Sequence, residues 1–146
     1  MDAEFLGFCR KDGVYSRIST LTQAFCAPLL LREPGSGSRD ILESVLYARG
    51  YELKNFEKIS QFESIPVLME LVKEDAGITF AYRAAVQRGS DWRQIVPLPK
   101  SVLFLQRKFW FVTLPSSPFL DDSLELFAFL KKVVKDNFPE NDSRGD

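Results

Sequence analysis

The sequence predicts an α/β fold in which a mainly parallel β-sheet is flanked by helices. Short apolar runs, typical of buried strands, alternate along the chain with segments of helical periodicity. Turn and helix-capping residues stand between them, as expected where a strand leads into a crossover helix. With 146 residues, 45% of them hydrophobic, the chain is long enough for one domain with a core, or for a lobe and part of a second.

In the first half of the chain, Glu4–Cys9 predicts a short buried strand. Thr20–Phe25 predicts a short helix, because Thr20 and Gln23 have the spacing of a capping box. Leu29–Leu31 is apolar throughout, which is typical of a strand covered on both faces. A helix then follows a polar loop, and its apolar face contains Ile41, Leu42, Val45 and Leu46.

The second half continues the alternation of strands and helices. The predicted strands or extended segments are Lys58–Phe62, Ala76–Ala81, Gln94–Leu98 and Lys108–Leu114, and the predicted helices are one that follows Ser64, Tyr82–Val86 and Leu120–Val134. Lys108–Leu114 (KFWFVTL) is the strongest strand signal in the chain. Leu120–Val134 is strongly amphipathic, with aspartates at its start and lysines at its end, which suits the helix dipole.

Composition argues against several classes of function. Nineteen basic and twenty acidic residues leave a net charge of −1 without a basic patch, so we do not expect this chain to bind nucleic acid directly. There is no histidine, and the two cysteines, Cys9 and Cys26, lack metal-binding spacing. We therefore expect no catalytic residues, no metal site and no cofactor, and we do not expect an enzyme.

The sequence shows neither a secretory signal at its N-terminus nor an apolar run long enough to span a membrane. We therefore expect a cytoplasmic protein without a membrane partner, in which both thiols are reduced.

The strongest candidate site is the loop from Arg32 to Arg39. Its segment Gly35-Ser36-Gly37-Ser38 lies between a predicted strand and a predicted helix, so backbone N–H groups and two hydroxyls could hold an anion. Arg32 and Arg39 could pair with the same ligand. Alternatively, the glycines only form the turn, one serine only caps the helix and the arginines are solvated. The spacing fits neither a Walker A loop nor a GxGxxG motif.

Ser64 is a second candidate, because it stands between a predicted strand and the next predicted helix. Its hydroxyl could point into the same cleft as the glycine-serine loop. The alternative is that Ser64 only caps its helix, with Pro66 in the first turn.

Two stretches resemble the C-terminal effector-binding domain of LysR-type transcription regulators. Leu29–Leu42 (LLLREPGSGSRDIL) is similar to the family's strand, Arg-Glu, Gly-Ser-Gly-Thr-Arg-like turn and helix, with Ser38 in the threonine place. Ser64–Phe80 looks like the family's next helix and strand, with Asp75 where the pattern has glycine. The similarity extends through Phe109–Leu130, which looks like the closing strand and final helix.

This resemblance implies a lobe like that of type 2 periplasmic binding proteins, with a return strand and a C-terminal helix from the other lobe. The implied divisions are a hinge strand at 1–9, the second lobe at 10–98, the return crossover, strand and helix of an incomplete first lobe at 99–138, and a disordered tail at 139–146. Gly35, Ser36, Gly37, Ser38 and Ser64 would line the cleft between the lobes, with Arg32 and Arg39 beside it.

The implied function is effector sensing in a LysR-type regulator, with a small, anionic ligand in the interlobe cleft. The alternative is a solute-binding protein of the same fold class. The chain would contact DNA only through a helix-turn-helix domain that is absent from this sequence. Because the first lobe is truncated, we expect exposed apolar surface around the return strand and self-association into dimers or larger oligomers.

Overall fold

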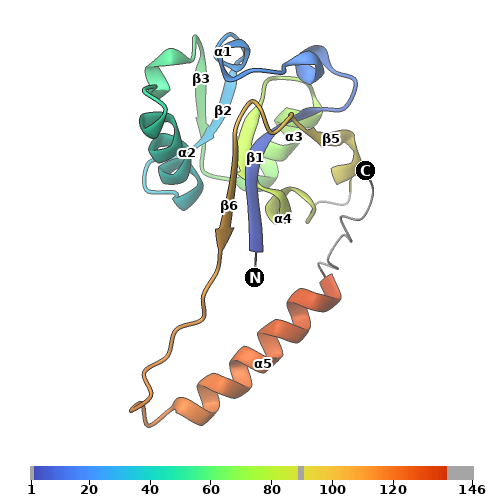
Figure 1. The fold of residues 1–146 in the computed structure, drawn as a ribbon. Helices are drawn as coiled ribbons and strands as arrows, with labels where there is room; N and C mark the ends of the chain where they lie inside the picture. The colour runs from blue at the N-terminus through green and yellow to red at the C-terminus, as the bar shows by residue number, and fades with distance from the viewer. Residues whose placement is uncertain (1, 89–90, 138–146) are drawn as a thin grey trace. The chain divides into compact units, whose positions relative to one another are not determined.

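The computed structural model describes residues 2–88 and 91–137 (Figure 1). The chain divides into two compact units, one of residues 2–108 and one that begins at Phe109, which are described separately here. The predicted disordered tail lies outside the described residues, and the predicted boundary between lobes at residue 98 stays a prediction. Within the described residues, no helix is both long enough and apolar enough to cross a membrane.

The first unit has the predicted alternation of strands and helices. Its strands are β1 (Asp2–Arg10), β2 (Leu29–Arg32), β3 (Ile59–Phe62), β4 (Thr79–Tyr82), β5 (Ile95–Pro97) and β6 (Phe104–Lys108). Its helices are α1 (Leu21–Ala24), α2 (Gly37–Ala48), α3 (Ile65–Lys73) and α4 (Arg83–Val86), with short 3-10 turns at Val14–Arg17, Leu53–Asn55 and Trp92–Gln94. The predicted capping box of α1, formed by Thr20 and Gln23, is present.

The mainly parallel sheet is confirmed only in part. β2 and β3 are parallel, and the Leu30 N–H donates to the Ile78 carbonyl at 2.8 Å, which aligns β2 with the chain entering β4. However, β1 is antiparallel to β4, β5 and β6. Crossover helices keep β2, β3 and β4 in one direction, whereas β1 runs the opposite way, so every strand that pairs with it is antiparallel.

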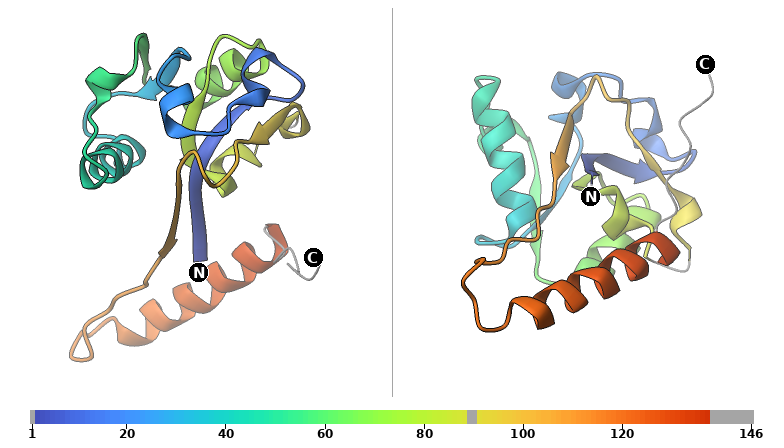
Figure 2. Two further views of the ribbon diagram at one scale, coloured as in Figure 1. Left: turned by 45° about the horizontal axis from the view of Figure 1, so that its top comes forward. Right: turned by 60° about the horizontal axis from the view of Figure 1, so that its bottom comes forward.

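The strands form a four-stranded sheet, β4-β1-β5 with β6 also paired to β1, and a two-stranded sheet, β2-β3. Helices cover these sheets on both faces, which gives two hydrophobic cores. On β1, Phe5 and Cys9 join the core under α1 and α2, and the alternate residues Leu6 and Phe8 join the core under α3 and α4. Leu30 of β2 faces the second core, between two residues that face the first. In Figure 2 the teal α2 lies on one side of the strands, and the yellow-green α3 and α4 lie on the other.

The turn before β4 contains aspartate where the family pattern has glycine. Asp75 adopts a left-handed backbone with φ of 59°, and its carboxylate accepts a hydrogen bond from the Val14 N–H at 2.8 Å. Gly77 follows, and a Cβ there would collide with the Pro28 carbonyl oxygen. A side chain at Gly77 would therefore push β4 away from β2.

In the second unit, α5 (Leu120–Asn137) confirms the predicted amphipathic helix, with Asp121 and Asp122 in its first turn. The predicted strand at Lys108–Leu114 is wrong, because the strand is β6 and ends at Lys108. Lys108 pairs with Asp2, the first residue of β1, and the pairing of β6 with β1 ends at these two residues.

Candidate functional site

A pocket of about 300 Å³ lies at the edge of the sheet where β2 and β4 end. At this edge β2 leads into α2, β3 into α3 and β4 into α4, so the pocket forms among the N-termini of helices. Ligands of open α/β sheets are bound at the carboxyl ends of strands for this reason. The volume is at the lower end of the range for small-molecule sites.

The glycine-serine loop forms one end of this pocket. Gly35 has a φ of 86°, which turns the chain after β2, and α2 begins two residues later, at Gly37. Ser36 occupies the N-cap position, but its hydroxyl caps no backbone N–H; instead its Oγ lies 3.0 Å from the Oγ of Ser38. This mutual bond uses one of the two hydroxyl protons, so the second can be donated to a ligand.

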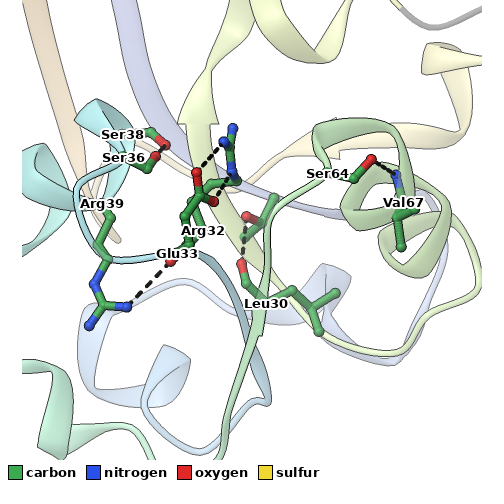
Figure 3. Close-up of polar contacts among 9 residues, drawn as sticks. Leu30, Arg32, Glu33, Ser36, Ser38, Arg39, Ser64 and Val67 are labelled. Atoms are coloured by element: carbon green, nitrogen blue, oxygen red, sulfur yellow. Dashed lines mark hydrogen bonds and ion pairs between the residues drawn. The ribbon is translucent and has the colours of Figure 1, made fainter.

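Ser64 has a different environment, as Figure 3 shows. Its Oγ accepts a hydrogen bond from the Val67 N–H at 3.4 Å, and so caps α3. The pocket is lined by the following residue, Ile65, but not by Ser64. The structure thus gives the Ser64 hydroxyl a role in helix capping, and its predicted role in effector binding stays a prediction.

The two arginines of the loop are held by carboxylates. Arg32 donates from Nε and Nη2 to the two carboxylate oxygens of Glu33, both at 2.7 Å. This hydrogen-bonded pair raises the pKa of Arg32 and lowers the pKa of Glu33. Arg39 donates to Glu43 at 2.7 Å. It also donates to the Arg32 carbonyl at 3.4 Å (Figure 3). Arg32 lines the pocket while paired with Glu33, whereas Arg39 does not line it.

The rest of the lining was not predicted from the sequence as part of a site. Thr79 is almost completely buried, with 3% of its surface exposed, and its hydroxyl donates to the Leu30 carbonyl at 2.8 Å. The apolar lining residues are Ile65, Leu68, Met69, Phe80, Ala81 and Ala85, with Tyr82 beside them. In the sequence these residues are visible only as part of the apolar pattern of α3 and β4. The same pattern is expected of residues in the hydrophobic core, so it does not identify a site.

The structure therefore brings together four of the seven predicted site residues: Arg32, Ser36, Gly37 and Ser38 line the pocket. Gly35 shapes the turn that precedes them. Arg39 and Ser64 do not line the pocket: Arg39 bonds to Glu43 and to the Arg32 carbonyl, and Ser64 caps α3. Within the described ranges, no cluster of three or more potential metal ligands was found.

A larger hollow of about 560 Å³ opens on the other end of α2, beside Tyr47 and Tyr51. Its two carboxylates are already engaged, because Glu43 pairs with Arg39 and Glu52 with Lys54 at 2.8 Å. It is lined neither by the ends of strands nor by the N-terminus of an α-helix, so the smaller pocket is the better candidate site.

Sheets covered by helices on both faces, with a pocket where β2 and β4 end, define a lobe of the periplasmic-binding-protein-like fold class. The chain belongs to the LysR substrate binding domain family, whose sequence pattern matches residues 16–135. No curated protein matches the sequence.

Solved structures of regulators have the same fold. The regulatory domain of CcmR from Synechocystis PCC6803, in complex with 2-PG, has a TM-score of 0.66 at 13% identity over 92% of this chain and 64% of that chain. Full-length HypT from Salmonella typhimurium, a hypochlorite-specific LysR-type regulator, has a TM-score of 0.60 at 14% identity over 91% of this chain and 45% of that chain. The effector domain of AmpR from Pseudomonas aeruginosa has a TM-score of 0.54 at 15% identity over 91% of this chain and 61% of that chain. The chain spans less than two thirds of each.

Proposed function

We propose that this chain is the effector-sensing part of a LysR-type transcription regulator and binds a small anionic ligand in the pocket at the N-terminus of α2. One observation carries the proposal: the hydroxyls of Ser36 and Ser38 line the pocket and bond to each other instead of capping the helix. The first-turn N–H groups of α2 thus lack a side-chain cap from Ser36 and can be donated to a ligand.

Family membership supports a regulator over a solute-binding protein, and the CcmR domain offers a related fold that holds a small molecule. In the proposal the pocket is one wall of an interlobe cleft, and ligand binding biases the closure of the lobes. Contact with DNA belongs to a helix-turn-helix domain outside this sequence, so the chain acts on transcription through the protein that carries it.

A thermal-shift screen of small carboxylates and oxyanions tests the ligand site. We expect at least one anion to raise the melting temperature of the native chain and to lose most of this effect in Ser38→Ala. Ser44→Ala is the matched control, because Ser44 lies on the same helix and donates to the Asp40 carbonyl outside this pocket. A stabilising anion that responds equally to both substitutions would place the site elsewhere.

Self-association is the second part of the proposal, supported by exposed apolar side chains in the second unit. More than half of the surface is exposed for Phe109, Trp110, Val112, Leu114, Phe119 and Phe129. Soluble monomers rarely present so many large apolar groups together. We expect static light scattering to give a mass above that of one 16.7 kDa chain, and a monomer at every concentration would refute this part.

A further inference from the structure

The polar side chains that line the pocket come from the α2 end, as Arg32, Ser36 and Ser38, and from β4, as Thr79 and Tyr82. Most of them already have partners. Thr79 has given its hydroxyl proton to the Leu30 carbonyl, so it cannot donate to a ligand. Arg32 uses two of its donors on Glu33. What remains for a ligand is one proton of the Ser36–Ser38 pair, the N–H groups of the first turn of α2 and the N–H donors of Arg32 that do not bond Glu33. These donors are enough for the oxygens of a carboxylate.

The charge at this end is also small. The guanidinium of Arg32 and the carboxylate of Glu33 are in contact at 2.7 Å and cancel as formal charges. The helix N-terminus adds a partial positive charge of roughly half an elementary charge. A single negative charge is matched here, whereas a doubly charged oxyanion would lose much of its hydration without a compensating cation.

The remaining lining is apolar and spans two layers of the fold. Ile65, Leu68 and Met69 come from α3, and Phe80 comes from β4. Leu68 and Phe80 are fixed in the hydrophobic cores, which makes this wall rigid. Hydrocarbon surface placed against it would leave water, at a gain of about 25 cal/mol for each Å².

We propose that the ligand of the proposed effector site, on which this inference rests, is an apolar monocarboxylate. Its carboxylate lies at Ser36, Ser38 and the first turn of α2. Its uncharged hydrocarbon body lies against the wall formed by Ile65, Met69 and Phe80. The two ends of such a molecule match the two ends of the pocket, and neither a small polar acid nor an inorganic oxyanion matches both.

Isothermal titration of the native chain with phenylacetate, acetate and inorganic phosphate at one ionic strength tests the ligand class. Phenylacetate should bind about tenfold more tightly than acetate, or better, because the phenyl group adds buried apolar surface. Phosphate should bind no more tightly than acetate.

Two variants of α3 locate the hydrocarbon body. Ile65→Ala should weaken the binding of phenylacetate severalfold and leave the binding of acetate unchanged. Val67→Ala is the matched control, since Val67 is 49% exposed, compared with 39% for Ile65, and does not line the pocket. It should leave both ligands unchanged, and circular dichroism melting would verify that both variants fold.

The possible failures are distinct. Equal affinity for acetate and phenylacetate, tighter binding of phosphate, or equal effects of Ile65→Ala and Val67→Ala would overturn the ligand class and leave the effector site in place. If none of the three binds but another anion of the screen does so through Ser38, the class is also wrong. If no anion of the screen binds at millimolar concentration, the proposed ligand-binding function itself fails.

Discussion

The junctions from β2 to α2 and from β3 to α3 both place a serine before a helix at the same edge of the sheet, but they use it differently. Ser64 accepts the Val67 N–H and so completes the first turn of α3. Ser36 has the same N-cap position on α2, yet its hydroxyl bonds to Ser38. A serine before a helix is therefore a structural cap in one case and part of a pocket lining in the other.

The neighbouring residues account for the difference. Ser38, two residues after Ser36, offers a second hydroxyl that competes with the backbone N–H groups as a partner. In α3 the corresponding place is occupied by Pro66, which offers no hydroxyl and no N–H, so Ser64 bonds to the backbone further on. The comparison predicts that substitutions of Ser36 and Ser38 act mainly on ligand affinity, and substitution of Ser64 mainly on stability.

The largest expected effect is that of the double substitution Ser36→Ala with Ser38→Ala. It removes the hydroxyl donors at the charged end of the ligand, and hydrogen bonds to charged groups contribute about 1.5–3 kcal/mol. Affinity for the acid found in the screen should fall by about tenfold or more, measured by calorimetric titration. The free energy of unfolding should change little, because neither hydroxyl caps the helix. A loss of stability with unchanged affinity would reverse the roles of the two junctions.

Gly35→Ala should destabilise the turn before α2. At a φ of 86° an alanine is in the left-handed region, which costs about 1–2 kcal/mol for a residue with a Cβ. Urea unfolding followed by circular dichroism measures this loss. Gly37→Ala is the control, because a Cβ there meets open space and no positive φ is required. Equal destabilisation by both substitutions would show that the turn is not the cause.

Ser64→Ala should cost about 0.5–1 kcal/mol of unfolding free energy, at the lower end for an N-cap because its bond to the Val67 N–H is 3.4 Å long. The same urea titration measures it, and the ligand affinity should be unchanged. Ser64→Asp, which can also cap, should restore the stability. If Ser64→Ala weakens the ligand instead, Ser64 belongs to the site after all.

Much of this fold was predictable because local patterns determine it. The apolar run at Leu29–Leu31 identified a strand buried on both faces, and the spacing of Thr20 and Gln23 identified a capping box that is present. The strand predicted at Lys108–Leu114 failed because hydrophobicity does not reveal whether a neighbouring strand exists. The prediction of a mainly parallel sheet failed in part for the same reason. The direction of pairing depends on β1, which lies far from its partner strands in sequence.

The site was predictable at the level of its backbone but not of its side chains. Glycine and serine between a strand and a helix are visible in the sequence, and they located the turn and the start of α2. The partner of each polar group was not visible: Glu33 and Glu43 lie near their arginines in sequence, but pairing depends on rotamers fixed by the fold. The apolar wall was hidden because Ile65 and Met69 have the pattern of ordinary core residues.

Glu33→Gln tests the electrostatic contribution to the site at the start of α2. It removes the charge that neutralises Arg32 and should raise the affinity for an anionic ligand by a few fold at low salt. The gain should shrink as salt is added, because this pair is partly exposed and therefore screened. Glu43→Gln is the matched control, since it frees Arg39, which does not line the pocket. Equal gains from both would indicate a general charge effect.

The smallest effect concerns the third junction, where β4 leads into α4. Arg83, the first residue of α4, donates to Glu4 of β1 at 2.6 Å, and Lys100 lies 3.5 Å from the other carboxylate oxygen. Burial alone would raise the pKa of Glu4, but the hydrogen bond and charge of Arg83, together with Lys100, outweigh it and lower the pKa below 4.5.

A lowered pKa means that Glu4 stabilises the folded state above its ordinary pKa and loses this effect as the pH falls through the lowered value. Because about a third of each side chain of the Glu4–Arg83 pair is exposed, the contribution should be below about 1 kcal/mol. The melting temperature of Glu4→Gln should therefore be slightly below that of the native chain at pH 7, and the two should converge below pH 4.5. A difference that persists at low pH would show that Glu4 acts through packing against α4 rather than through its charge.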